Sequence, residues 1–205
     1  MSADVLEEMR KRIFFLSKKH HLSHIGSCVS ALPIIYEIFQ KKKPQDRFVL
    51  SCGHAGIALY VVMEKFDGLN AEELYRLMGV HPTKQAAIDP YIHVSTGSLG
   101  MGLTVACGMA QENKQHDVYC LISDGECGSG SIWESLCYAK ENLPNLKVYV
   151  NINGYSATKE LDTENLKSRL WAFLPTIKIR ETYSLLPWCR GLESHYYVMK
   201  EGDNA

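Results

Sequence analysis

The 205-residue chain lacks the features that mark membrane-bound, secreted or nucleic-acid-binding proteins. Its longest uninterrupted apolar stretch, residues 57–63, is far too short to cross a bilayer. Residues 1–12 are rich in charge and contain no apolar segment of the kind that a signal peptide needs. The formal net charge is −1, so no excess of positive charge indicates binding to nucleic acid or to an anionic membrane. These absences predict a cytoplasmic protein that binds neither membrane nor nucleic acid.

The chain also lacks a pattern of paired cysteines. Its seven cysteines are an odd number, and none of them forms a CxxC pair. Cys107, Cys120 and Cys137 lie within apolar stretches, which predicts buried free thiols in a reducing compartment. There is no internal repeat, low-complexity segment or linker, and the length suffices for one domain with a large core. We therefore expect residues 1–205 to form a single domain.

Short apolar runs alternate with segments of helical periodicity along the chain. Strands are expected at residues 47–51, 118–122, 147–151 and 176–182. Helices are expected at residues 3–19, 30–40, 56–65, 99–112 and 162–173. Two further helix starts are predicted from capping pairs, Asn70 with Glu73 and Ser131 with Glu134, the second helix running through Lys140. The alternation predicts an α/β fold with a doubly wound, mostly parallel sheet and helices on both faces.

Two polar residues follow neighbouring apolar runs of this predicted sheet. Asp124 comes after the run at residues 118–122, and Asn153 comes after the run at residues 148–150. Consecutive parallel strands end at the same edge of a sheet, where open α/β sheets bind ligands, so Asp124 and Asn153 can meet there. A carboxylate and an amide oxygen suit Mg²⁺ or Ca²⁺, ions that commonly bridge a protein to a diphosphate. Asp-Gly and Asn-Gly are also common turns, but their occurrence at both strand ends favours a binding site.

A glycine-rich segment precedes one of the predicted helices. Gly97, Gly100 and Gly102 would let the backbone approach a ligand closely, and the free N–H groups of the following helix could meet phosphate oxygens. The alternative interpretation is a tight turn from strand to helix.

Five segments together resemble the N-terminal domain of transketolases in their order and spacing. They are residues 23–30 (SHIGSCVS), 46–55 (DRFVLSCGHA), 81–82 (HP), 93–102 (HVSTGSLGMG) and the stretch from Asp124 to Asn153. The second is similar to the family's DRFVLSxGHA, the fourth to its VSTGSLGQG, and the fifth to its Gly-Asp-Gly…Asn motif for thiamine diphosphate. The resemblance spans residues 20–155, roughly two thirds of the chain.

This resemblance implies a thiamine-diphosphate-binding fold and a set of site residues. The cofactor would be bound by Gly97, Ser98, Leu99, Asp124, Gly125, Glu126, Asn153 and His195. Mg²⁺ or Ca²⁺ would be held by the Asp124 carboxylate, the Asn153 side-chain oxygen and the backbone carbonyl of Tyr155. His24, His54 and His81 would be the catalytic residues, binding substrate hydroxyls and transferring protons, work that suits imidazole because its pKa lies near neutrality.

The resemblance also implies an activity and a partner. Transketolases transfer a two-carbon ketol unit from a ketose, usually a sugar phosphate, to an aldehyde. The pyrimidine-binding and C-terminal domains of the family have no counterpart in residues 1–205. The chain therefore looks like the diphosphate-binding subunit of a split transketolase, which a pyrimidine-domain subunit would complete in a homodimer or heterotetramer.

Some residues depart from the family pattern. Serine, isoleucine and methionine replace its usual glycine, proline and glutamine at Ser123, Ile25 and Met101, and Ser129 replaces a glutamate of an interface network. Residues 156–205 are short and diverged. Two alternatives remain open: a subunit of a thiamine-dependent enzyme that decarboxylates or ligates 2-oxo acids in a specialised biosynthetic pathway, and a non-catalytic regulatory homologue.

Overall fold

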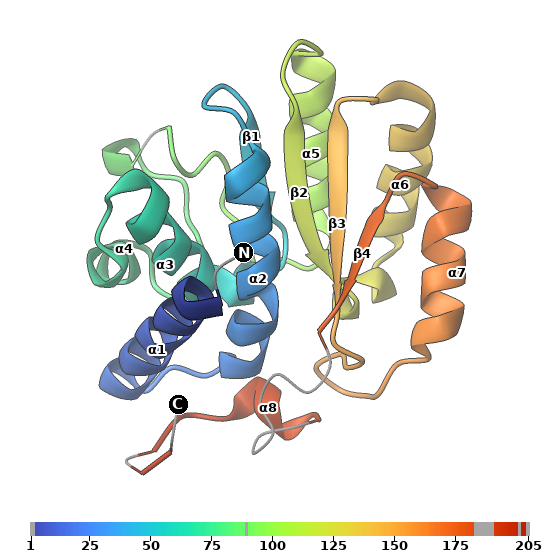
Figure 1. Ribbon diagram of the computed structural model, residues 1–205. Helices are drawn as coiled ribbons and strands as arrows, with labels where there is room; N and C mark the ends of the chain where they lie inside the picture. Colours follow the sequence, from blue (N-terminus) through green and yellow to red (C-terminus); the bar gives the residue numbers. More distant parts are fainter. Residues whose placement is uncertain (1–2, 89, 183–190, 201, 204–205) are drawn as a thin grey trace.

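The structure is a computed structural model that describes residues 3–88, 90–182, 191–200 and 202–203 (Figure 1). Its centre is a four-stranded parallel sheet in the order β1-β2-β3-β4. The strands are β1 (Arg47–Leu50), β2 (Val118–Ser123), β3 (Leu146–Ile152) and β4 (Lys178–Glu181). The predicted parallel α/β architecture is confirmed, and all four strands lie within the predicted ranges or one residue beyond them.

Helices cover both faces of the sheet (Figure 1). On the first face lie α1 (Ala3–His20), α2 (Ile25–Lys41), α3 (Gly56–Asp67) and α4 (Ala71–Met78). On the second face lie α5 (Met101–Glu112), α6 (Gly130–Asn142) and α7 (Thr163–Phe173). The remaining helical segments are short: η1 (Gly53–Ala55), η2 (Ala86–Ile88), η3 (Gly125–Gly128) and α8 (Glu193–Tyr196).

The two cores follow from the alternation of side chains along each strand. Phe48 and Leu50 of β1 pack into the core of the first face, whereas Val49 between them packs into that of the second. In β2, Leu121 and Ile122 divide in the same way. Because both faces of β2 are buried, that strand is apolar up to Ser123, whereas β4 at the edge of the sheet is mostly charged and only partly buried. No helix in the described part of the chain is long and apolar enough to span a membrane.

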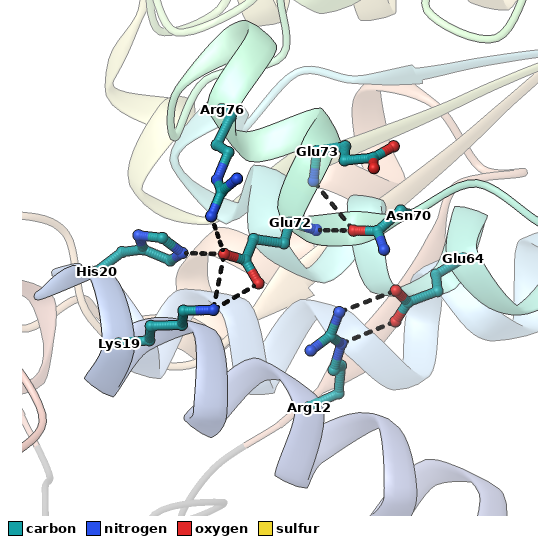
Figure 2. Close-up of polar contacts among 8 residues, drawn as sticks. All are labelled: Arg12, Lys19, His20, Glu64, Asn70, Glu72, Glu73 and Arg76. Atoms are coloured by element: carbon teal, nitrogen blue, oxygen red, sulfur yellow. Dashed lines mark hydrogen bonds and ion pairs between the residues drawn. The ribbon is translucent and has the colours of Figure 1, made fainter.

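Charged side chains tie the first helix to its neighbours (Figure 2). Arg12 of α1 donates two hydrogen bonds to Glu64 of α3, at 2.9 and 3.0 Å. Glu72 of α4 accepts from Lys19, His20 and Arg76. Partly exposed pairs each contribute little to stability, so this network adds only modestly to the packing of α1 against α3 and α4.

The predicted start of α4 is confirmed, since the Asn70 side chain accepts the backbone N–H groups of Glu72 and Glu73 at 3.0 and 3.1 Å (Figure 2). The predicted cap of α6 is wrong. This helix begins after Ser129, whose side chain instead donates to the Leu99 carbonyl, and no side-chain hydrogen bond caps its first turn. The start of α6 is therefore set by its contact with the glycine-rich turn and not by the predicted capping pair of Ser131 and Glu134.

Two other predictions need correction. Helix α2 begins at Ile25, five residues before the predicted start at residue 30, and the residue before it, His24, has a left-handed conformation with φ 63°. Gly26, a poor helix former, concealed this first turn in the sequence. Cys107 and Cys120 are buried free thiols as predicted, but Cys137 is exposed because it lies on the outer side of α6.

Candidate functional site

The predicted meeting of Asp124 and Asn153 occurs at the carboxyl edge of the sheet. Strands β2 and β3 are adjacent and parallel, with Ser123 opposite Asn151. One Asp124 carboxylate oxygen, Oδ2, accepts the backbone N–H groups of Asn153 and Gly154 at 2.9 and 2.8 Å. The other, Oδ1, accepts that of Gly125 at 2.9 Å. The carboxylate thus joins the turns that follow the two strands.

The Asp124 carboxylate is buried, and its hydrogen bonds from backbone N–H groups compensate only in part for its lost hydration. The residue is only 1% exposed, and burial raises its pKa to about 6, although backbone hydrogen bonds, those from Gly154, Asn153 and Gly125 among them, act in the opposite direction. A carboxylate offers about four lone pairs, so acceptance of three hydrogen bonds leaves one direction for a cation. A bound divalent cation would favour the ionised carboxylate and so offset its loss of hydration.

The other two predicted metal ligands lie beside Asp124. The Asn153 side-chain oxygen accepts the backbone N–H of Tyr155 at 3.0 Å, which fixes the orientation of the amide. The Tyr155 carbonyl oxygen faces Gly125, 3.8 Å from where a Cβ on that glycine would lie. Among the described residues there is no cluster of three His, Cys, Asp or Glu side chains suited to a metal. One carboxylate, one amide oxygen and one backbone carbonyl nevertheless form a hard-oxygen set that fits Mg²⁺ or Ca²⁺.

Three histidines from distant parts of the chain meet at the N-terminal end of α2. The ring centroids of His24 and His195 are 4.5 Å apart, and His54 lies 5.6 Å from His24 and 5.7 Å from His195. The backbone N–H of His24 donates to the His195 carbonyl at 3.1 Å, which holds α8 against the start of α2. A left-handed non-glycine residue such as His24 is uncommon and strained, and such residues cluster at functional sites.

Burial keeps these imidazoles neutral. Burial, together with the smaller effect of the neighbouring imidazoles, lowers the pKa of His24 to about 4 and that of His54 to about 3. Burial also lowers the pKa of His195. Each neutral ring has one nitrogen that donates and one that accepts. Nδ1 of His24 is buried and has no hydrogen-bond partner among the described residues.

The glycine-rich turn brings His81 to the same place. A Cβ on Gly97 would lie 2.9 Å from Cδ2 of the His81 ring, and φ of Gly97 is 137°. Both the close approach and the backbone conformation therefore require glycine. The turn ends at Gly100, where α5 begins.

A cavity of about 880 Å³ connects these features. Ten predicted site residues line it: His24, His54, His81, Gly97, Leu99, Asp124, Gly125, Asn153, Tyr155 and His195. Ser98 and Glu126 do not line it. Ser98 is exposed. Glu126 is fully buried, where its carboxylate accepts from Ser51 and from the backbone N–H groups of Gly100 and Ser123.

Sequence reasoning missed other residues that line the cavity. Asn165 and Arg169 lie one turn apart on α7, and Lys159 lies on the loop after Asn153. The spacing of four residues places Asn165 and Arg169 on the same face of a helix. This spacing could have indicated a role at the site only if the position of the helix relative to the sheet edge were already known.

Comparison with known proteins places the chain in a family. Residues 2–184 match the family described as 1-deoxy-D-xylulose-5-phosphate synthase, at its N-terminal domain. One of the subunits of the apulose-4-phosphate transketolase of Phocaeicola vulgatus is 34% identical over 192 residues, which are 82% of this chain and 67% of that protein. The chain belongs to the transketolase family. Human transketolase is 41% identical over 153 residues, which are 63% of this chain and 24% of the enzyme.

Solved transketolases share the fold. The Pichia stipitis enzyme matches with a TM-score of 0.64 at 24% identity, covering 82% of this chain and 30% of that one. The Leishmania mexicana enzyme matches with a TM-score of 0.58 at 20% identity, covering 80% of this chain and 31% of that one. This transketolase-family chain therefore spans about a quarter of the length of human transketolase. Family membership confirms the resemblance found in the sequence motifs.

Proposed function

We propose that this chain is the diphosphate-binding subunit of a split, thiamine-diphosphate-dependent transketolase. The observation that carries the proposal is the cavity at the sheet edge, which is lined both by Asp124 with Asn153 and by four histidines. The first pair suits a metal-bound diphosphate, and the histidines suit a substrate with several hydroxyl groups. The family membership makes thiamine diphosphate the cofactor that fits this division.

The metal and diphosphate would bind at the edge of β2 and β3. Mg²⁺ (or Ca²⁺) would be held by the oxygens of Asp124, Asn153 and the Tyr155 backbone. Gly125, which also lines the cavity, would donate its N–H to the diphosphate when its bond to Asp124 is exchanged. Gly97 and Leu99 of the glycine-rich turn would contact the remainder of the cofactor. Ser98 and Glu126, predicted as contacts, would act from outside the cavity.

Thiamine diphosphate, when bound, would supply a nucleophilic carbon and an electron sink for cleavage of a carbon–carbon bond. The chain's own contribution is to bind hydroxyl groups and move protons. His24, His54 and His81, with His195 beside them, would do both, since a neutral imidazole can donate at one nitrogen and accept at the other. The His24 ring lines the cavity, and its buried Nδ1 has no hydrogen-bond partner among the described residues.

The substrate class would be a ketose or sugar phosphate as donor and an aldehyde as acceptor. The names of two relatives support this choice: one belongs to an apulose-4-phosphate transketolase, and the Pichia stipitis transketolase was solved in complex with fructose-6-phosphate. The reaction would transfer a two-carbon ketol unit.

A second, pyrimidine-domain subunit would complete the active site. The Phocaeicola vulgatus relative, which is named as one subunit of a transketolase and is covered to 67% by the match, supports this division of the enzyme between two chains. A cofactor shared between subunits would favour a heterotetramer of two such pairs.

Isothermal titration of thiamine diphosphate with Mg²⁺ tests the proposal, with the chain alone and with its partner subunit. Binding should tighten with the partner and be lost in Asp124→Ala. Asp117→Ala is a matched control, because Asp117 precedes the same strand at its opposite end. Absence of binding to the wild-type pair would refute the function and favour a regulatory homologue. Binding followed by turnover of 2-oxo acids only would favour the decarboxylating alternative.

A further inference from the structure

The cavity has a permanently charged residue on the side away from the histidines. Arg169 belongs to α7, which packs on the second face of the sheet through Leu166 and Leu170. His24 and His54 instead come from α2 and η1, on the first face. Asp124 stands between them, at the end of β2. Arg169 therefore approaches the metal and diphosphate end of the cavity from the side opposite to the histidines.

The side chain of Arg169 is held in position by aromatic residues. Its guanidinium carbon lies 4.2 Å from the centroid of the Trp133 ring. The indole N–H of Trp133 donates to the Cys127 carbonyl at 2.8 Å, and Phe173 packs edge-on against the indole at 5.1 Å. Cys127 lies in η3, the turn that directly follows Asp124. Trp133 thus fixes the guanidinium relative to the turn that carries the predicted diphosphate contact.

The charge of Arg169 is not neutralised by the protein. Among the described residues, no carboxylate lies within ion-pair distance of its guanidinium. Lys159 and Arg169 are the lysine and arginine that line the described part of the cavity. The Asp124 carboxylate already cancels half of the charge of a divalent cation. The remaining positive charge is smaller than the negative charge of a diphosphate, so a further cationic group is needed to balance it. A planar guanidinium can donate two parallel hydrogen bonds to the oxygens of one phosphate. It loses little conformational entropy on binding when it is already stacked on an aromatic ring.

We propose that Arg169 binds the terminal phosphate of the cofactor, with Trp133 as the residue that positions it. This inference rests on the proposed function and adds to it a residue that selects between forms of the cofactor. Arg169 would distinguish a diphosphate from a monophosphate, because a monophosphate held at the same thiazolium end stops short of α7. The sheet-edge residues alone would bind both forms.

Titrations with two ligands test this proposal. Thiamine diphosphate and thiamine monophosphate, each with Mg²⁺, are titrated into the wild-type protein with its partner subunit, into Arg169→Gln and into Arg10→Gln. Arg10 is a control because it pairs with Glu7 on α1, outside the cavity. Arg169→Gln should weaken binding of the diphosphate by about 10- to 100-fold and leave that of the monophosphate within about twofold. Arg10→Gln should change neither affinity.

Three results would overturn the assignment. An unchanged diphosphate affinity in Arg169→Gln means that Arg169 does not bind the ligand. An equal loss for both ligands means that it only supports the fold. If Arg169→Gln fails to fold, Arg169→Lys, which keeps the charge, decides by the same comparison of the two ligands. Wild-type protein that does not bind thiamine diphosphate would overturn the proposed function as well, whereas the other outcomes leave that function standing.

Discussion

The buried carboxylate of Glu126 accepts the backbone N–H of Gly100, 26 residues earlier in the chain, at 3.0 Å. The same oxygen accepts from the Ser51 hydroxyl at 2.7 Å, and the second oxygen accepts the N–H of Ser123 at 3.0 Å. One side chain therefore joins the end of β1, the end of β2 and the start of α5. The glycine-rich turn keeps its position above the sheet edge through this contact.

Replacement of Glu126 should destabilise the protein. Glu126→Ala leaves three buried donors without an acceptor, which should lower the free energy of unfolding by about 3 kcal/mol or more. Glu126→Gln keeps one acceptor oxygen but turns an amide N–H₂ toward a donor, so its loss should be smaller. Urea denaturation of the wild type and both variants measures the difference. Wild-type stability of the alanine variant would contradict the bridging role.

Gly97 should tolerate no side chain. Gly97→Ala places a methyl group 2.9 Å from the His81 ring at a φ of 137°, so we expect a loss of about 1–3 kcal/mol in stability and weaker cofactor binding. Gly108→Ala is the matched control, because Gly108 lies within α5 and has open space around its Cβ position. That control should gain up to about 1 kcal/mol. Thermal unfolding and titration with thiamine diphosphate compare the two. A melting temperature of Gly97→Ala equal to that of the wild type would disprove the steric argument.

The buried carboxylate of Asp124 should make metal-free protein less stable as the pH rises. Burial raises its folded-state pKa to about 6, above the ordinary value of 3.8, so between these values the folded protein binds more protons than the unfolded chain. The free energy of unfolding then falls with rising pH, by up to about 1.4 kcal/mol per pH unit. Asp124→Asn should remove this slope, and Mg²⁺ should restore stability to the wild type alone. Urea denaturation with and without Mg²⁺ measures both, and identical slopes in the two proteins would contradict the assignment.

The neutral histidines should have the opposite effect on stability. The pKa of His54 falls from 6.5 in an exposed histidine to about 3, so the unfolded chain binds more protons than the folded protein between those values. The free energy of unfolding therefore falls as the pH falls through this window, by up to about 1.4 kcal/mol per pH unit for this group. His54→Gln should be less sensitive to acid in urea denaturation. The slope from Asp124 is common to both proteins and cancels in the comparison.

A surface histidine provides the control for this measurement. His21 is exposed and has φ 53°, so His21→Asn keeps a residue that tolerates the left-handed conformation. Its pH dependence should match that of the wild type. A slope that is unchanged in His54→Gln as well would show that this imidazole is not buried in neutral form.

The sheet and its helices could be predicted because their signals are local. Apolar runs identified β1, β2 and β3, the range predicted at residues 176–182 contains β4, and Asn70 identified the start of α4. The failures have a physical cause in long-range contacts. Ser129 and Ser131 lie against Gly100, so docking rather than capping sets the start of α6. Gly26 lies in the first turn of α2, where a Cβ would lie 2.9 Å from the hydroxyl oxygen of Ser194, from the other end of the chain.

The sequence by itself determined that Asp124 and Asn153 would meet, since the connection between consecutive parallel strands brings their carboxyl ends to one edge. It also determined that Gly97 belongs to a turn where the backbone is approached closely. Only the tertiary structure decided that His195 joins His24 and His54, that Glu126 points into the interior and that Arg169 reaches the cavity from the other face of the sheet. These positions depend on packing between segments far apart in the chain, and no local periodicity encodes such packing.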